Sequence, residues 1–121
     1  MKDFASPYGE YNTKVITAIK KYYRSHRSTD DGFNTKAATD VYNIKVQNIL
    51  NTTTPAQVGK WVDQAIKDKS WLVLVYHEVE AGAEDPTYAV TPANLKAELD
   101  LIQQKGIAVE TVEHALNELG K

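Results

Sequence analysis

Cysteine is absent from this chain of 121 residues, and so are long apolar runs, internal repeats and an excess of basic charge. Without cysteine, disulfides, thiolate nucleophiles and cysteine-ligated metal sites are excluded. No run of 18 apolar residues occurs, so we expect no membrane-spanning helix. The first residues, Met1-Lys2-Asp3, do not lead into the apolar segment of a signal peptide. The net charge of −2 gives no reason to expect a nucleic acid or an anionic membrane as partner.

Four helices are predicted by capping residues followed by apolar residues at helical spacing. The predicted caps are Asn12, Thr54, Thr91 and Thr111, and proline follows two of them. The stripe Val58, Trp61, Val62, Ala65 and Ile66 after Thr54 illustrates the spacing. The first helix is expected to continue to about Tyr23, with cations near its end.

Strands are predicted between these helices. Phe4-Ala5 leads into a sharp corner, residues 42–47 alternate between apolar and polar, and residues 107–109 form a short apolar run. Residues 71–76 are six apolar residues in a row, which predicts a strand buried on both faces of a parallel sheet. Residues 28–40 are interpreted as a loop. The order of elements predicts one α/β domain over residues 1–121, a partial (β/α) barrel with four or five strands and four helices.

Two candidate functional groups follow strands of this barrel. One is the corner Ser6-Pro7-Tyr8-Gly9, and the other is His77, directly after the apolar run. Because parallel β/α folds carry their working residues at the carboxyl ends of strands, both groups are expected on the same rim. His77 suits general acid or base chemistry, or simply a hydrogen bond at a strand end. Tyr8 offers a backbone N–H for an oxyanion, or forms a plain turn.

Four stretches in order carry a family resemblance: FASPYGEYN, RSTDDGFNT, WLVLVYHEV and TPANLKAELDLIQQKGIAVETVEHAL. Together they resemble the C-terminal half of polysaccharide deacetylases of carbohydrate esterase family 4. A strand followed by Pro-Tyr-Gly and a helix is one of that family's five signature blocks, and an apolar strand followed by histidine is another. The resemblance covers nearly the whole chain.

The resemblance implies a distorted (β/α) barrel and metal-assisted hydrolysis of N- or O-acetyl groups on sugars. It assigns two catalytic roles: the backbone N–H of Tyr8 stabilises the oxyanion, and His77 protonates the departing amine or hydroxyl. It assigns substrate binding to Pro7 and Gly9 of the turn and to Leu74, which would line the acetyl pocket. The implied partner is an acetylated polysaccharide, and the implied location of the parent enzyme is secreted or at the cell surface.

The chain departs from the family pattern in several places. Ala5 stands where the family often has an arginine that orients the catalytic base, and Arg27 lies near the position of the fourth block. The first two blocks, Thr-Phe-Asp-Asp-Gly and His-x-x-x-His, have no counterpart before Phe4. These blocks supply the base and the ligands of the divalent metal, zinc or similar. We therefore expect no metal ligands in this chain, a missing N-terminal half as partner, and no activity of the isolated chain.

Other interpretations of single motifs remain open. Residues 28–32 superficially resemble the Asp-Asp-Gly run, but a surface turn is favoured because His26, His77 and His114 are scattered and zinc needs converging ligands. The acidic loop 78–85 suits a hard cation or is merely solvated.

Residues 20–27 mix bases and aromatics, yet the chain is net acidic and we expect no nucleic acid partner. Trp61 and Trp71 favour core packing, or sugar stacking if exposed on the rim.

A second function class also fits the sequence: a non-enzymatic glycan-binding or assembly module of α/β type. In either class a half-barrel leaves an open sheet edge and an uncovered inner face. Such a chain is expected to form a homodimer, exchange elements or close up compactly.

Overall fold

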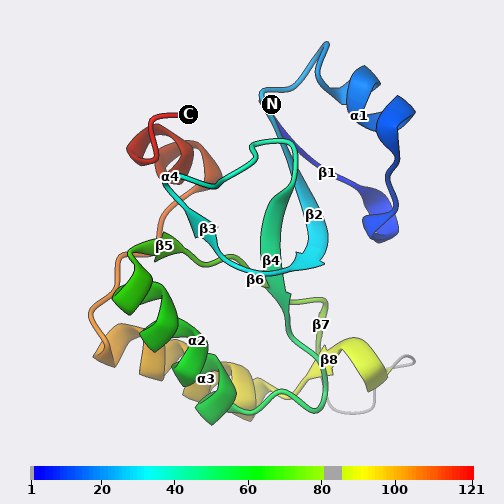
Figure 1. The fold of residues 1–121 in the computed structure, drawn as a ribbon. Helices are drawn as coiled ribbons and strands as arrows, with labels where there is room; N and C mark the ends of the chain where they lie inside the picture. The colour runs from blue at the N-terminus through cyan, green and yellow to red at the C-terminus, as the bar shows by residue number, and fades with distance from the viewer. Residues whose placement is uncertain (1, 81–85) are drawn as a thin grey trace.

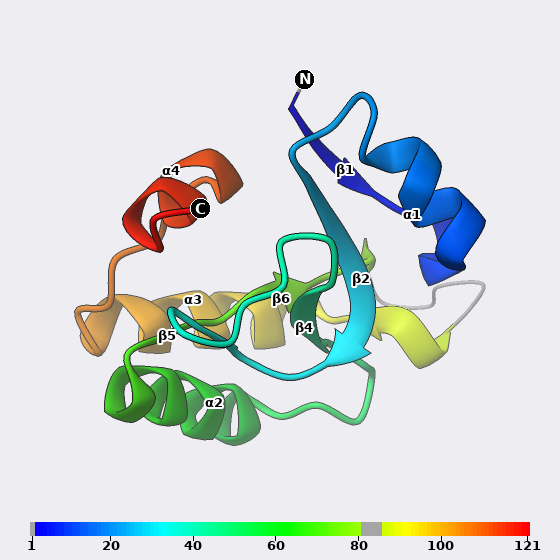
Figure 2. The ribbon, with the colours of Figure 1, turned by 45° about the horizontal axis from the view of Figure 1, so that its top comes forward.

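Four parallel strands form a curled sheet, half of a barrel, at the centre of the molecule (Figures 1 and 2). The computed structural model describes residues 2–80 and 86–121. The strand order is β1-β2-β4-β6, and every neighbouring pair is parallel. The strands are β1 (Asp3–Ala5), β2 (Ser25–Asp31), β4 (Ile44–Asn48) and β6 (Leu74–Val75). The predicted α/β class and parallel pairing are confirmed.

Four α-helices accompany the sheet, and each begins at a predicted cap. Asn12 Oδ1 accepts a hydrogen bond from the N–H of Val15 at 3.0 Å. Thr54, Thr91 and Thr111 each accept a hydrogen bond through Oγ1, at 3.2 Å, from the backbone N–H of the residue three positions later. The helices are α1 (Thr13–Ile19), α2 (Pro55–Asp68), α3 (Pro92–Gln104) and α4 (Val112–Glu118). The first helix ends at Ile19, earlier than predicted.

Several short elements join these parts. Two antiparallel strands, β3 (Asn34–Thr35) and β5 (Ser70–Trp71), pair beside the sheet. The strands β7 (Glu78–Val79) and β8 (Ala89–Val90) pair in parallel. Single 3₁₀ turns occur at η1 (Pro7–Gly9) and η2 (Pro86–Tyr88).

The prediction of a loop over residues 28–40 is wrong in its first part, because Ser25–Asp31 forms β2, an interior strand of the sheet. The apolar periodicity that predicts a strand is missing here, because the side chains of β2 are polar. The register between β2 and β4 shifts between Arg27 and Asp31. Ser28 supports this irregularity: its hydroxyl donates to the Ile44 carbonyl at 3.1 Å and accepts from the Asp30 N–H at 3.2 Å. The Asp-Asp pair therefore ends a strand and does not form an isolated surface turn.

The apolar run 71–76 is also not one strand buried on both faces. It divides between β5 and β6, and all six residues are only half-buried. The physical reason is position, since β6 is the last strand of the four-stranded sheet and pairs only with β4 among the described residues. Residues 107–109 are irregular, so the short strand predicted there is wrong, and Val109 is 83% exposed.

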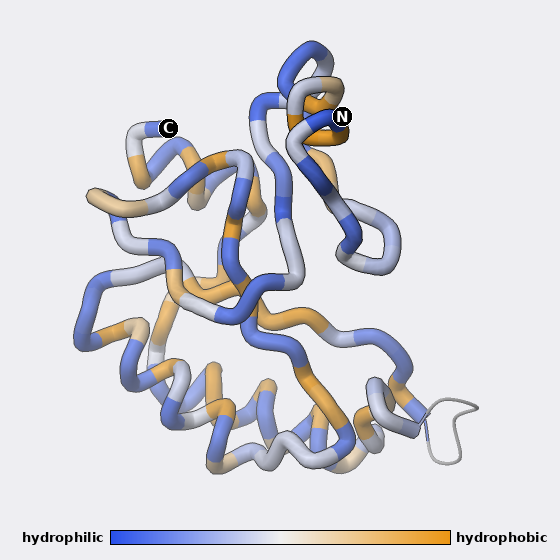
Figure 3. Tube along the Cα trace, turned by 45° about the vertical axis from the view of Figure 1, so that its right-hand side comes forward, coloured by the Kyte–Doolittle hydropathy of each residue, from blue (hydrophilic) through white to orange (hydrophobic). Residues whose placement is uncertain are grey.

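The hydrophobic core lies between α2, α3 and the sheet. Its buried centre comprises Ile49, Val58, Val62 and Val90, and Trp61 packs against it. Apolar and polar residues alternate along α2 and α3, as Figure 3 shows. Apolar residues on one side of each helix meet in this core, so the predicted stripe of α2 is confirmed except at Ile66, which is 47% exposed.

Candidate functional site

A cleft of about 1200 Å³ lies at the carboxyl ends of the sheet strands. The turn after β1, the end of β4, and Val75 of β6 with the two residues that follow it all contribute to its walls. Pro7, Tyr8, Gly9 and His77, four of the five residues singled out from the sequence, line this one cleft. The parallel order of the strands brings them together, as expected of groups that follow β1 and β6.

The turn after β1 has an unusual backbone. Tyr8 adopts φ 56° and ψ 10°, in the left-handed region, at a strain of about 1 kcal/mol or more for a non-glycine residue. Its side chain is fully exposed. The Gly9 N–H donates to the Ser6 carbonyl at 3.1 Å, whereas the Tyr8 N–H has no acceptor among the described residues. A Cβ on Gly9, at φ 74°, would collide with the Thr29 side chain. Close packing on β2 therefore fixes the direction of the Tyr8 N–H.

A buried histidine anchors this turn from behind. His26 is completely buried, with Nδ1 2.9 Å from the Tyr42 carbonyl and Nε2 2.8 Å from the Ser6 hydroxyl. Because a carbonyl only accepts, Nδ1 carries the hydrogen and Nε2 accepts from Ser6. The rings of Phe4 and Tyr11 enclose the imidazole. In the sequence His26 is one of three scattered histidines, and no local pattern reveals its pairing with Ser6 across 20 residues.

His77 stands at the opposite wall of the cleft. Its side chain is exposed, and its ring centroid lies 4.9 Å from that of Tyr88 at an interplanar angle of 53°. Tyr88 belongs to η2, which is tied down where the Asn51 N–H donates to the Thr87 carbonyl at 2.9 Å. The two ring nitrogens of this exposed imidazole can donate or accept hydrogen bonds within the cleft. Tyr88 was not predicted from the sequence, because it becomes a wall of the cleft only through the fold.

Charged and amide groups of β2 and β4 also line the cleft. Arg27 is half-buried, donates from Nη1 to the Ser28 carbonyl at 3.3 Å, and forms no ion pair within the described part of the chain. Burial lowers the pKa of the Arg27 guanidinium. At the other end of β2, Asp31 Oδ1 accepts from Asn48 Nδ2 at 3.2 Å. The same Asn48 nitrogen donates to the Thr29 carbonyl at 3.0 Å.

Aromatic rings add flat apolar surface to the same cleft. Trp61, Tyr76 and Tyr88 line it, alongside the side-chain amides of Gln47 and Gln57. Aromatic faces next to amides and a few charges suit a polar ligand with an apolar face, such as a sugar ring. The two tryptophans are separated by the fold, because Trp71 faces a different cavity.

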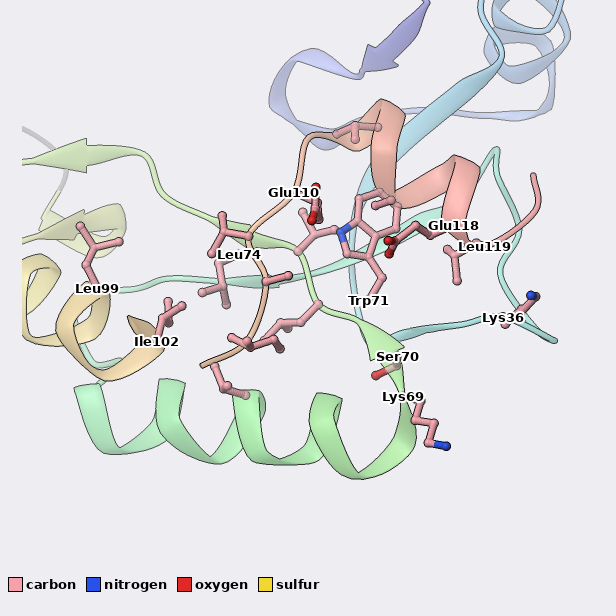
Figure 4. Close-up of a pocket in the computed structure, with 18 of the residues that line it drawn as sticks. Lys36, Lys69, Ser70, Trp71, Leu74, Leu99, Ile102, Glu110, Glu118 and Leu119 are labelled. Carbon is pink, nitrogen blue, oxygen red and sulfur yellow. The ribbon is translucent and has the colours of Figure 1, made fainter. Parts of the chain in front are cut away.

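Leu74, the fifth predicted residue, lies on that second cavity (Figure 4). This cavity measures about 630 Å³ and is bordered by α2, α3, α4 and the segment around Trp71. Leu74 packs against the hydrophobic core and does not line the cleft. The alternation of side chains along a strand explains the separation, since its neighbour Val75 faces the cleft instead.

Tyr76 lines both the cleft and the second cavity. Its hydroxyl donates to Oε2 of Glu98 at 2.8 Å. Glu98 is completely buried, and its Oε1 has no hydrogen-bond partner in the described structure. Burial first, and then the hydrogen bond to Glu98, raise the pKa of Tyr76 well above its usual value. Tyr76 is therefore a neutral donor at physiological pH, and its contact with Glu98 holds β6 to α3.

The family resemblance implies a metal site with three protein ligands. Among residues 2–80 and 86–121, no three His, Asp or Glu side chains gather as metal ligands. Asp31 and His77 are the only such side chains of the described part that line the cleft. Asp30 instead accepts a hydrogen bond from the Tyr11 hydroxyl at 2.6 Å. A zinc-type site needs three converging protein ligands, so the described residues do not fit the metal. In the acidic loop, Glu84 and Asp85 lie outside the described residues.

No described helix has the length and apolar character needed to cross a membrane. No family model matches the chain. Comparisons with curated proteins and with solved structures find no match either.

Proposed function

We propose that this chain forms the glycan-binding half of a metal-dependent polysaccharide deacetylase, an enzyme that hydrolyses N- or O-acetyl groups on sugars. The observation that carries the proposal is the shared cleft: the Tyr8 turn and His77 follow separate strands, 69 positions apart in sequence, yet they line one cleft. The sequence resemblance supplies the reaction class.

Each of the two groups has a definite task in that reaction. When water adds to the acetyl carbonyl, negative charge develops on the carbonyl oxygen, and the free Tyr8 N–H is available to donate to it. One such preorganised donor contributes a factor of about 10² to 10³ to the rate. As the bond from the acyl carbon to the sugar nitrogen or oxygen breaks, the His77 imidazolium gives the leaving atom a proton.

The remaining walls suit the sugar. Trp61 and Tyr88 present apolar rings against which the C–H face of a pyranose packs, and Gln57 offers donors and acceptors for hydroxyl groups. The glycan would then lie across the carboxyl ends of the strands with its acetyl group between Tyr8 and His77. The parent enzyme would meet such polymers outside the cell or at its surface.

The catalytic base and the ligands of the metal, zinc or similar, are assigned to residues outside residues 1–121. This assignment predicts binding without turnover for the isolated chain. Acetate release from an acetylated chito-oligosaccharide, measured with added zinc or cobalt, is expected to equal the rate without protein. Robust metal-dependent turnover would contradict the assignment and would direct attention to His26, Asp30 and Asp31.

Binding is measured separately, by tryptophan fluorescence and NMR during titration with tri-N-acetylchitotriose. The Trp61→Ala variant is expected to weaken binding, since it removes an aromatic wall. Lys60→Gln, an exposed neighbour on α2, is the matched control and is expected to leave binding unchanged. Equal binding by all three proteins would contradict a glycan site in the cleft.

A non-enzymatic glycan-binding module is the second candidate, favoured by the lack of three metal ligands among the described residues. The coding sequence upstream of Met1 separates the two. An in-frame Thr-Phe-Asp-Asp-Gly and His-x-x-x-His there would support the hydrolase. A stop codon followed by a start at Met1 would support the binding module.

A further inference from the structure

The surroundings of the Arg27 side chain favour the binding of an anion. It lines the cleft, its side chain is half-buried, and the one hydrogen bond of that side chain in the described structure is a long contact of 3.3 Å with the neighbouring Ser28 carbonyl. Arginine otherwise pairs readily with carboxylates in this chain, as Arg24 does with Asp3 at 2.9 Å. A guanidinium has five N–H donors and no means of losing its charge, so its partial removal from water favours an anionic partner.

The neighbouring strand leaves room for that partner. Ala5 on β1 is in register with Arg27 on β2, and both residues line the cleft. Adjacent strands lie about 4.8 Å apart, so the single methyl group of Ala5 leaves more space beside the Arg27 side chain than a longer residue would. Asp31, the one carboxylate of the described residues that lines the cleft, is four residues further along β2 and bonded to Asn48. Arg27 and Asp31 form no ion pair in the described structure.

We propose that Arg27 forms a carboxylate-binding site in the cleft, beside Ala5 and next to the Tyr8 turn. The planar guanidinium matches the two oxygens of a carboxylate and binds them through two parallel N–H···O bonds. This site is independent of the proposed deacetylase function, because it requires only the cleft geometry and one cation.

The charge inventory favours a carboxylate over a phosphate group. Arg27 is the only lysine or arginine among the described residues that line the cleft, and Asp31 carries a negative charge at the other end of the same strand. A dianionic phosphate would meet one cation and a nearby anion, whereas a singly charged carboxylate balances one guanidinium. The carboxylate has two possible sources, a small free carboxylate or an aspartate or glutamate side chain from another polypeptide segment.

The test is an NMR titration of the full chain that follows the Arg27 Nε–H resonance and the backbone amide of position 27, which is also present in a lysine variant. The probes are sodium acetate for the free source, N-acetyl-aspartate methylamide for the side-chain source, inorganic phosphate, and sodium chloride at matched ionic strength. Acetate or the blocked aspartate is expected to bind with a dissociation constant on the order of millimolar. Tighter binding of acetate assigns the site to a small ligand, and tighter binding of the blocked aspartate assigns it to a side chain.

Three variants secure the assignment. Arg27→Lys keeps the charge but loses the planar fork, so binding is expected to weaken about fivefold or more. Ala5→Glu supplies a carboxylate beside Arg27 in the chain itself and is expected to abolish binding of the added probe. Lys60→Gln lowers the net charge by one, as Ala5→Glu does, but away from the cleft, and is expected to leave binding unchanged.

The proposal is overturned if neither carboxylate shifts the Arg27 resonance more than sodium chloride does. Phosphate binding tenfold tighter than both carboxylates would overturn the choice of ligand class. Unchanged acetate binding in a folded Ala5→Glu variant would also overturn the proposed position of the site. Circular dichroism of each variant establishes that it is folded before the titration.

Discussion

The cleft and the second cavity, which lie on either side of β6, are lined by different kinds of groups. The cleft of about 1200 Å³ is shaped by backbone: a left-handed turn at Tyr8, strand ends, and polar side chains held by hydrogen bonds. The cavity of about 630 Å³ is shaped mainly by apolar side chains, among them Trp71 and Leu74 (Figure 4). Tyr76 is a wall of both. The cleft therefore contains the polar groups that are suited to binding and catalysis, and the second cavity belongs with the hydrophobic core.

The largest effect on the free energy of unfolding is expected at Tyr76, which separates the cleft from the second cavity. Tyr76→Phe removes the single hydrogen-bond donor to the buried Glu98 carboxyl group. Leaving that group without a partner is expected to lower the free energy of unfolding by about 3 kcal/mol. Urea denaturation measures it. The control is Tyr22→Phe, at a side chain that is 78% exposed, where a change below about 0.5 kcal/mol is expected. Equal effects of the two substitutions would show that the Tyr76–Glu98 contact stabilises nothing.

Alkaline pH provides a second measurement on the same wall. The pKa of Tyr76 is raised in the folded protein, so the folded state keeps its proton after the unfolded chain begins to lose it at a pH near 10. A raised pKa contributes stability that is complete below the unfolded value and is lost as pH rises. Unfolding free energies of the wild type are therefore expected to fall more steeply above about pH 10 than those of Tyr76→Phe. Parallel pH profiles would contradict the assignment.

The turn of the polar cleft is the next target. Gly9→Ala introduces a Cβ that is strained at φ 74° and collides with Thr29. A loss of about 2 kcal/mol or more is expected. Gly106→Ala is the matched control, because Gly106 has a similar φ of 66° but nothing within 4 Å of the added carbon. Its expected loss is about 1 kcal/mol. Thermal melts that show no difference would contradict the close packing of the turn on β2.

Removing the anchor behind the turn should have a smaller effect. Ser6→Ala leaves Nε2 of the buried His26 without its donor, and a loss of about 1.5 kcal/mol is expected. The measurement also has a spectroscopic side: ¹⁵N shifts of His26 should show the hydrogen on Nδ1 in the wild type. A hydrogen on Nε2 instead would refute the described network.

The smallest effect is expected at the exposed rim of the apolar cavity. Glu110 is hydrogen-bonded to His114, and this hydrogen bond raises the pKa of that imidazole. The Glu110→Gln substitution is expected to bring the pKa back toward its usual value. The pair stabilises α4 below the unfolded pKa of about 6.5, and the effect disappears as pH rises through the folded value. NMR titration of His114 measures both, and an unchanged pKa in the variant would exclude the pairing.

The sequence predicted the features that local patterns encode. Helix caps such as Thr54 are determined within four residues, and the parallel strand order placed Tyr8 and His77 on one rim. The strand Ser25–Asp31 was not predicted, because its buried side chains are polar. These side chains form hydrogen bonds with residues that are distant in sequence.

The contributions of Arg27 and Tyr88 to the cleft have the same cause. Arg27 matters because of its register with Ala5, and Tyr88 because its ring meets His77. Neither relation follows from the residue types or their spacing. Leu74 was assigned to the acetyl pocket by resemblance alone, and one step of strand alternation places it in the apolar cavity instead.

The most direct test of the account is an NMR titration of the chain with tri-N-acetylchitotriose that maps amide and imidazole shifts. The account predicts simultaneous perturbation of the Tyr8 and Gly9 amides and the His77 ring, with the Trp71 indole of the apolar cavity unaffected. Perturbation of Trp71 alone, or of only one wall of the cleft at saturation, would contradict the claim that the turn and the histidine form a single site.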